Sequence, residues 1–129
     1  MEKRLKVILS GGGTGGHIYP AVATAEALVR LLGDKVEVMF VGAEGKMEME
    51  KIPALGYKIV GLPVVGLQRR LTLSNLLLPF KVAKSMRLAR RLLRDEKADL
   101  AIGFGGYASG PLLKAAQKMG IPTVLQEQN

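Results

Sequence analysis

A length of 129 residues with 48% hydrophobic side chains accommodates one globular domain with a buried core and leaves little room for a second. The chain has no cysteine and one histidine, which excludes disulfides, thiolate catalysis and a multi-histidine metal site. The formal net charge of +8 is concentrated in residues 69–97, which contain nine basic and two acidic side chains.

Apolar runs and helical spacings alternate along the chain in a strand–helix order. The expected strands are residues 5–9, 36–41, 57–62, 99–103 and 123–126. The expected helices are residues 20–32, with Pro20 in the first turn, 46–54, a long helix from 74 or 75 to about 96 with a break at Pro79, and one from 109 or 110 to 120. This alternation predicts an α/β fold: a Rossmann-like, doubly wound parallel sheet with strand order 3-2-1-4-5.

The first strand ends in a glycine-rich turn, SGGGTGGH at residues 10–17. Glycines let a ligand approach the main chain, and the helix behind the turn directs unpaired N–H groups toward an anion, usually a phosphate. A second glycine turn, GFGGYASGP at residues 103–111, follows the fourth strand, which the predicted order places beside the first. We therefore expect both turns to face one crevice and to bind a diphosphate there. The alternative role of such glycines is to make tight strand-to-helix turns.

Two common nucleotide-binding motifs fit this turn poorly. Gly11, Gly13 and Gly16 satisfy G-x-G-x-x-G, but the acidic residue expected at the end of the second strand is missing, since Glu44 lies later, in a turn. A P-loop is disfavoured because His17 stands where its lysine should follow the last glycine. A nicotinamide-dependent oxidoreductase is therefore a weaker hypothesis.

Three motifs occur in a fixed order along the chain: GGTGGH at 12–17 followed by Pro20, GFGGY at 103–107 followed by SGP, and EQN at 127–129. Together they resemble the MurG family, the N-acetylglucosaminyltransferases that make lipid II, the peptidoglycan precursor. The resemblance covers residues 1–129. It implies the amino-terminal half of a GT-B glycosyltransferase: a single Rossmann-like acceptor-binding domain, with the carboxy-terminal donor-binding domain absent. In one departure, Gln126 stands where the family often has histidine.

The resemblance implies inverting transfer of N-acetylglucosamine from UDP-N-acetylglucosamine to undecaprenyl-diphospho-muramoyl-pentapeptide (lipid I), without a cofactor. We expect the chain to be inactive without the second domain, supplied in cis or in trans. The positions that match the family's donor contacts are Thr14, Gly15, Gly16 and Asn129. The residues expected to bind the acceptor diphosphate are Gly13, Gly105, Gly106, Tyr107 and Ser109. No metal is expected, because helix dipoles and backbone donors can neutralise part of the phosphate charge.

Inverting transfer is a single displacement, so it requires a base but no protein nucleophile. His17 is the first candidate base, because imidazole titrates near neutrality and His17 lies at the mouth of the turn. Its alternative roles are to cap the turn or to hydrogen-bond the substrate. Glu127 is a second candidate base or a residue that orients its loop, and Tyr107 either reaches the acceptor or packs.

The long helix combines two faces. Val82, Met86, Ala89 and Leu93 form an apolar face that should pack on the sheet, and Lys84, Arg87, Arg91 and Arg94 form a basic face. The basic face is either an ordinary solvated surface or, with the leucines before it, a peripheral contact to an anionic membrane. The residues expected at this contact are Arg69, Arg70, Leu76, Leu77, Phe80, Lys81, Lys84, Arg87 and Arg91. Nucleic acid is not an expected partner, because aromatic side chains for stacking are few.

No apolar segment approaches the roughly 18 residues that spanning a bilayer requires, and the first apolar run is too short for a secretory signal. We expect a cytoplasmic protein that is peripheral on the inner face of the cell membrane. The alternative to a transferase domain is a non-catalytic module that binds a lipid diphosphate or a nucleotide. The two hypotheses differ on whether the reading frame continues past Asn129 into a second strand–helix domain.

Overall fold

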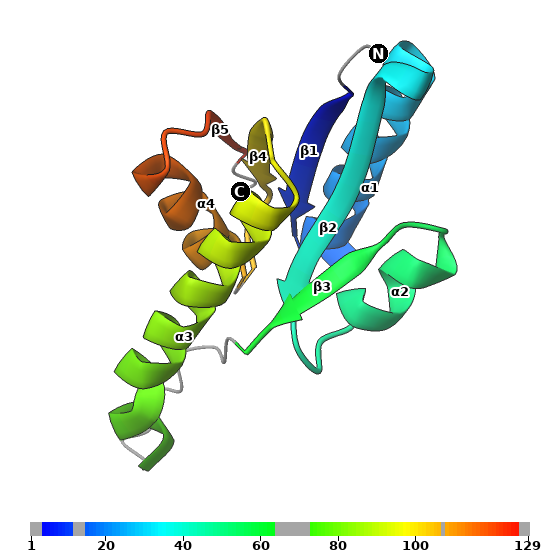
Figure 1. Cartoon of the computed structure of the whole chain (residues 1–129). Coiled ribbons are helices and arrows are strands. Elements are labelled where there is room, and N and C mark those ends of the chain that lie inside the picture. Colours follow the sequence, from blue (N-terminus) through cyan, green and yellow to red (C-terminus); the bar gives the residue numbers. More distant parts are fainter. Residues whose placement is uncertain (1–3, 12–14, 64–72, 107, 127–129) are drawn as a thin grey trace.

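In the computed structural model, the chain forms a parallel five-stranded sheet with helices on both faces (Figure 1). The structure describes residues 4–11, 15–63, 73–106 and 108–126, but not the side chains of residues 73–79 and 81. The strands are β1 (Leu5–Ser10), β2 (Val36–Ala43), β3 (Ile59–Leu62), β4 (Leu100–Gly103) and β5 (Thr123–Leu125). The helices are α1 (Gly15–Leu32), the 3-10 turn η1 (Gly33–Lys35), α2 (Glu48–Ala54), α3 (Leu73–Asp95) and α4 (Ser109–Lys118). The sheet order is β3-β2-β1-β4-β5, which confirms the predicted topology.

Alternate residues of β1 serve two separate cores. Val7 and Leu9 pack with residues of α1 and α2 on one face of the sheet, whereas Ile8 packs with residues of α3 and α4 on the other. All three side chains are fully buried. Because successive strand residues point to opposite faces, this central strand is apolar throughout, as expected for a sheet covered on both sides.

Two helices differ from their predicted bounds. Helix α1 begins at Gly15, so Pro20 lies inside the helix and not in its first turn. The amide that Pro20 lacks would have bonded the Gly16 carbonyl, and a glycine there lets this early turn adjust. Helix α3 continues through Pro79, where a break was predicted. A proline removes one backbone bond, which a long helix tolerates near its end.

The apolar face of α3 is buried only in its second half. Ala89 and Leu93 are fully buried and Met86 is partly buried, but Val82 is 42% exposed, so the prediction that the whole face packs on the sheet is wrong at Val82. The second half of α3 packs mainly on α4 and also touches β3. The first half of α3 projects beyond the sheet in Figure 1, and this explains the exposure of Val82.

A buried serine on α3 provides a test of this packing. Ser85 is fully buried, and its hydroxyl has no hydrogen-bond partner among the described residues. A buried unsatisfied hydroxyl costs about 1–3 kcal/mol. We expect Ser85→Ala to raise the free energy of unfolding by about 1 kcal/mol, measured by urea denaturation. A loss of stability would show that the hydroxyl has a partner.

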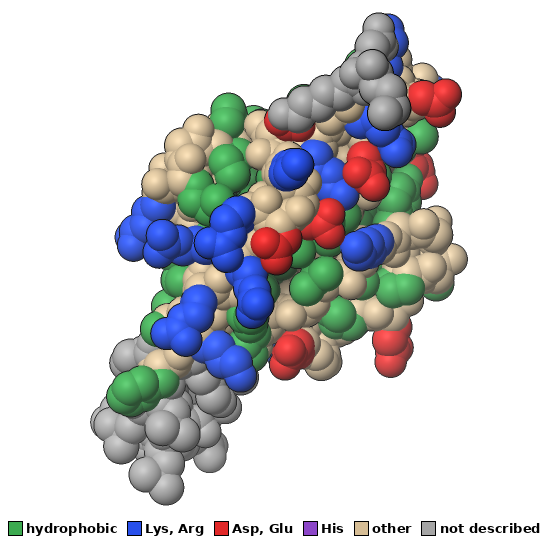
Figure 2. Space-filling view, in the orientation of Figure 1, with side chains coloured by type: hydrophobic (Ala, Val, Ile, Leu, Met, Phe, Trp, Pro, Cys, Tyr) green, Lys and Arg blue, Asp and Glu red, His purple; other side chains and the backbone are tan. Residues whose placement is uncertain are grey.

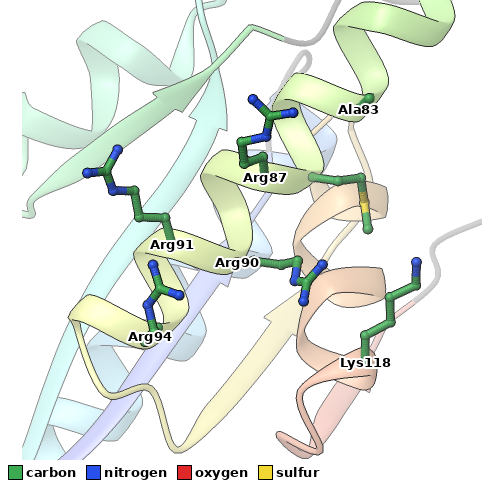
Figure 3. Close-up of a pocket in the computed structure, with 7 residues that line it drawn as sticks. Ala83, Arg87, Arg90, Arg91, Arg94 and Lys118 are labelled. Atoms are coloured by element: carbon green, nitrogen blue, oxygen red, sulfur yellow. The ribbon is translucent and has the colours of Figure 1, made fainter.

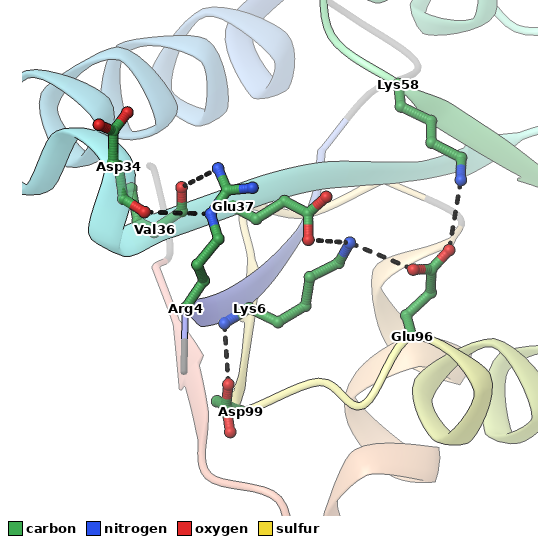
Figure 4. A network of polar contacts seen from close by, with 8 residues as sticks. All are labelled: Arg4, Lys6, Asp34, Val36, Glu37, Lys58, Glu96 and Asp99. Atoms are coloured by element: carbon green, nitrogen blue, oxygen red, sulfur yellow. Dashed lines mark hydrogen bonds and ion pairs between the residues drawn. The ribbon is translucent and has the colours of Figure 1, made fainter. Parts of the chain in front are cut away.

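A network of ion pairs lies at the amino-terminal edge of the sheet (Figure 4). Lys6 on β1 is 7% exposed, and its Nζ lies 3.0 Å from Glu37 and 3.1 Å from Glu96. Glu96 also pairs with Lys58 at 3.3 Å. The Lys6 amide donates to the Asp99 carboxylate at 2.8 Å, and the Asp99 amide donates to the Lys6 carbonyl at the same distance. The network thus connects Glu96, which follows α3, to β1 and β2 and to residues that adjoin β3 and β4.

The network predicts acid sensitivity. The hydrogen bond from Lys6 lowers the pKa of Glu96, against the opposing effect of its partial burial, and Lys58 lowers it further. A carboxylate with a lowered folded-state pKa stabilises fully above the ordinary glutamate value, about 4.3, and this contribution is lost as pH falls through the lowered value. Below about pH 4.3, we expect the free energy of unfolding of Glu96→Gln to fall less steeply than that of the wild type, measured by urea denaturation at several pH values. Glu50→Gln, at an exposed position of α2, is the control, and equal flattening in both variants would contradict the assignment.

Candidate functional site

The carboxyl ends of β1 and β4 lie side by side and start the two glycine turns. The strands pair in parallel with Ser10 opposite Gly103, and the Phe104 amide donates to the Ser10 carbonyl at 2.8 Å. The turns after parallel neighbours begin at the same sheet edge, which is where doubly wound folds bind their ligands. The topology therefore places the starts of the two turns at one edge of the sheet, the expected site of the crevice.

His17 and Gly105 bring the two turns into contact. A Cβ added to Gly105 would lie 2.8 Å from His17 Cδ2 and 2.9 Å from His17 Nε2, closer than real side chains approach. The imidazole thus packs directly against the backbone of the second turn at Gly105. Gly105 also has a φ of +98°, a left-handed conformation that side chains rarely adopt. Gly105 is required for two independent reasons, its backbone conformation and its contact with His17.

Ser109, the first residue of α4, connects the same two turns through its hydroxyl. Its side chain is buried, and Oγ lies 2.9 Å from the Ser10 carbonyl oxygen and 2.7 Å from the Gly105 carbonyl oxygen. A hydroxyl has one hydrogen, so the two carbonyls share it. Ser109 remains a predicted diphosphate ligand, but its hydrogen would have to leave these carbonyls to reach a phosphate.

The backbone around the crevice favours an anion. Helix α1 begins at Gly15 directly after the first turn, and α4 begins at Ser109 directly after the second, so the positive ends of both helix dipoles lie at this edge. The first-turn amides of α1, which include those of Gly15 and Gly16, have no partner within the helix. In the second turn Gly106 has a φ of +90°, next to the left-handed Gly105. Each helix terminus contributes about 0.3–1 kcal/mol to the binding of a negative charge.

Several predicted site residues fall outside the described residues. These are Gly13, Thr14, Tyr107, Glu127 and Asn129 at the crevice, and Arg69 and Arg70 at the membrane contact. The side chains of Leu76, Leu77 and Lys81 are likewise outside the description, although α3 runs through these positions.

A second concave surface, the basic groove, lies between α3 and α4. It has a volume of about 630 Å³ and is lined by Ala83, Met86, Arg87, Arg90, Arg91, Arg94 and Lys118. Figure 3 shows Arg90 extending from α3 toward α4, which carries Lys118. Lys118 ends α4, nine residues after Ser109, so it lies about 14 Å along the helix from the residue that begins α4. None of the residues that line the groove belongs to a glycine turn. The basic groove and the crevice are separate features.

Basic side chains continue from the groove along the exposed side of α3 (Figure 2). Lys84, Arg87 and Arg91 are exposed, and Phe80, one turn before Lys84, is 73% exposed. Arg94 pairs with Asp95 at 3.9 Å, and within the described part of the chain no ion pair is recorded for Arg87 or Arg90. The basic face predicted for α3 is thus exposed at these positions. Of the apolar residues expected at the membrane contact, Phe80 is the one whose side chain the structure describes. In the described ranges, no helix combines the length and apolar composition that crossing a membrane would need.

Sequence reasoning missed some participants at both surfaces. The Ser10 carbonyl accepts two hydrogen bonds that fasten the second turn, but a backbone carbonyl has no sequence signature. Arg90 and Lys118 line the basic groove together, but they lie on different helices, so no spacing within one helix relates them. Among the residues that the structure describes, no three His, Cys, Asp or Glu side chains gather where they could hold a metal ion.

The crevice and both glycine turns lie within a recognised domain. Residues 7–129 match the family model described as the glycosyltransferase family 28 N-terminal domain. The chain belongs to glycosyltransferase family 28. The predicted resemblance to the MurG family is confirmed as well, because the relatives below are MurG-type transferases.

Curated relatives of this family-28 chain are similar along its whole length. The chain is 55% identical over 129 residues to the UDP-N-acetylglucosamine–N-acetylmuramyl-(pentapeptide) pyrophosphoryl-undecaprenol N-acetylglucosamine transferase of Phocaeicola vulgatus, covering 100% of the chain and 34% of the relative. It is 54% identical over 128 residues to the transferase of the same name from Cytophaga hutchinsonii, covering 99% of the chain and 34% of the relative. The chain spans about a third of the length of these relatives.

Solved structures agree with the family-28 fold. The crystal structure of Acinetobacter baumannii MurG has a TM-score of 0.80 and 32% identity, over 97% of this chain and 36% of that chain. A plant structure, Phytolacca americana UGT2 complexed with UDP-2fluoro-glucose and pterostilbene, has a TM-score of 0.64 at 16% identity, over 98% of this chain and 31% of that chain, and supports the fold alone. The predicted fold class, a Rossmann-like half of a GT-B glycosyltransferase, is confirmed.

Proposed function

We propose that the chain is the acceptor-side domain of an inverting glycosyltransferase that transfers N-acetylglucosamine from UDP-N-acetylglucosamine to lipid I, giving lipid II. The observation that carries this proposal is the contact of the His17 imidazole with Gly105, at the sheet edge where α1 and α4 begin. A group that can accept a proton thus lies beside backbone donors suited to a diphosphate. Relatives named as N-acetylglucosamine transferases at about 55% identity support the same reaction.

Each part of the crevice has a role in this proposal. His17 removes the proton from the attacking sugar hydroxyl as the new glycosidic bond forms, and UDP leaves with the electron pair of the old one. The backbone of Gly13, Gly105 and Gly106 binds the acceptor diphosphate, with Tyr107 and Ser109 beside it. Thr14, Gly15, Gly16 and Asn129 contact the donor, while Glu127 either orients its loop or replaces His17 as base. A second GT-B domain provides the remaining donor contacts.

The basic face of α3 would hold the proposed enzyme at the membrane that contains its acceptor substrate. Lipid I is anchored in a membrane, so a domain that binds it must work at the bilayer surface. Exposed Phe80 next to Lys84 and Arg87 suits the boundary between headgroups and acyl chains of an anionic leaflet. We propose peripheral attachment to the inner face of the cell membrane through this surface.

An activity assay tests the proposal. Lipid I and UDP-N-acetylglucosamine are incubated with the chain alone, with a separately supplied family-28 donor domain alone, and with both. We expect lipid II only when both domains are present. Turnover by the chain alone would contradict the expectation that the second domain is required. Tight binding of a lipid diphosphate with no transfer in any mixture would favour the alternative, a non-catalytic binding module.

A further inference from the structure

The imidazole of His17 packs against the backbone of Gly105, a residue without a side chain. A Cβ built on Gly105 would meet three ring atoms, Cδ2, Nε2 and Cγ, at 2.8, 2.9 and 3.4 Å. The Nε2–Cδ2 edge of the ring therefore lies nearest to the position that a Gly105 Cβ would occupy. A small displacement of this peptide would change the packing of the ring on its Nε2–Cδ2 side.

The position of Gly105 depends in turn on Ser109. The one hydrogen of the Ser109 hydroxyl is shared between the Gly105 carbonyl, at 2.7 Å from Oγ, and the Ser10 carbonyl, at 2.9 Å. Ser10 ends β1, the central strand of the sheet, so the hydroxyl connects a left-handed glycine peptide to that strand. Ser109 is itself 4% exposed, which protects these bonds from competing water.

We propose that Ser109 is a positioning residue that acts on His17 through Gly105. Its hydroxyl fixes the Gly105 carbonyl, and the fixed glycine backbone holds the imidazole at the mouth of the crevice. Without the hydroxyl, the Gly105 peptide is free to rotate and the ring loses its support on that side. His17 makes a further interaction of its own, so the ring is loosened and not released. The proposal rests on the proposed function for its catalytic meaning, but the geometry is testable without any substrate.

The single histidine of the chain makes the ring directly observable. In an NMR spectrum of the 129-residue chain, His17 gives one set of imidazole signals. We expect a strong cross-peak between His17 Hδ2 and the Gly105 Hα protons. In Ser109→Ala this cross-peak should lose most of its intensity, and the Hδ2 signal should shift. Ser85→Ala is the matched control, because it also removes a buried helical hydroxyl, one without a partner among the described residues, and should leave the His17 signals unchanged.

A glycine substitution tests the other half of the arrangement. Gly105→Ala places a methyl group against the ring and should displace the Hδ2 signal further than Ser109→Ala does. Gly56→Ala is its control, since Gly56 has a similar φ of +92° and an added Cβ would meet nothing within 4 Å. Gly56→Ala therefore carries the backbone strain alone and should leave the His17 signals in place. If Ser109→Ala does not fold, Ser109→Cys takes its place, because a thiol is a much weaker hydrogen-bond donor than a hydroxyl.

Two results would overturn the proposal: absence of the cross-peak in the wild-type chain, or its full retention in a folded Ser109→Ala variant. Neither result depends on transferase activity. Failure of the positioning proposal with active enzyme would leave the proposed function intact. A confirmed cross-peak with no transfer by the two-domain mixture would leave the positioning intact and remove its catalytic meaning.

Discussion

Replacing His17 with alanine is expected to lower the rate of N-acetylglucosamine transfer by about 100- to 10,000-fold, the range that one positioned general base contributes. The ring lies against Gly105 at the edge where α1 and α4 begin, so its removal takes the proposed proton acceptor away from the diphosphate site. The measurement is the initial rate with lipid I and UDP-N-acetylglucosamine, with the chain combined with a donor domain.

His17→Gln separates the two roles of this residue. Glutamine keeps hydrogen-bonding capacity but cannot act as a base, so a rate as low as that of His17→Ala would support proton transfer. A rate near that of wild type would contradict the base role and indicate a hydrogen bond to the substrate. Arg30→Ala is the control, because Arg30 is exposed on the same helix about 20 Å further along and should leave the rate unchanged. Glu127→Gln tests the other candidate base in the same assay.

The topology of the site was predictable because it depends on features that repeat along the chain. Short apolar runs alternate with helical spacing, and right-handed crossovers then leave few possible strand orders. Once β1 and β4 are neighbours, the glycine turns that follow them must share an edge. This order brings the start of α1, which carries His17, to the same edge as Gly105.

The finer features were not predictable, because they depend on single contacts across the fold. Lys6 interrupts the apolar run of β1, yet its buried ammonium is matched by Glu37 and Glu96, which are far from it in sequence. The hydrogen bonds of Ser109 go to backbone carbonyls, which every residue possesses. The basic groove requires α4 to bring Lys118 beside α3, and helical periodicity describes one helix at a time. Local patterns therefore specify the elements, and contacts between elements specify the site.

Reversing two charges on α3, Arg87→Glu with Arg91→Glu, is expected to weaken binding to phosphatidylglycerol vesicles by up to about 1,000-fold. Both side chains are exposed, and each basic charge near an anionic leaflet contributes about 1 kcal/mol, so two reversals remove about 4 kcal/mol. The measurement is sedimentation with vesicles at increasing salt, where wild-type binding should decline as the charges are screened.

The matched control is Arg30→Glu with Lys35→Glu, which changes the net charge by the same amount. Both residues are exposed, Arg30 in the last turn of α1 and Lys35 at the end of η1, and α1 covers the face of the sheet opposite α3 and α4. If the location of the charge matters, this variant should keep most of its vesicle binding. Equal weakening of both variants would show that only net charge acts, and the basic face would then be an ordinary solvated surface. If the loss of binding is confined to the α3 variant, α3 must face the bilayer. That orientation would keep the crevice at a fixed distance from the membrane that holds the acceptor's lipid anchor.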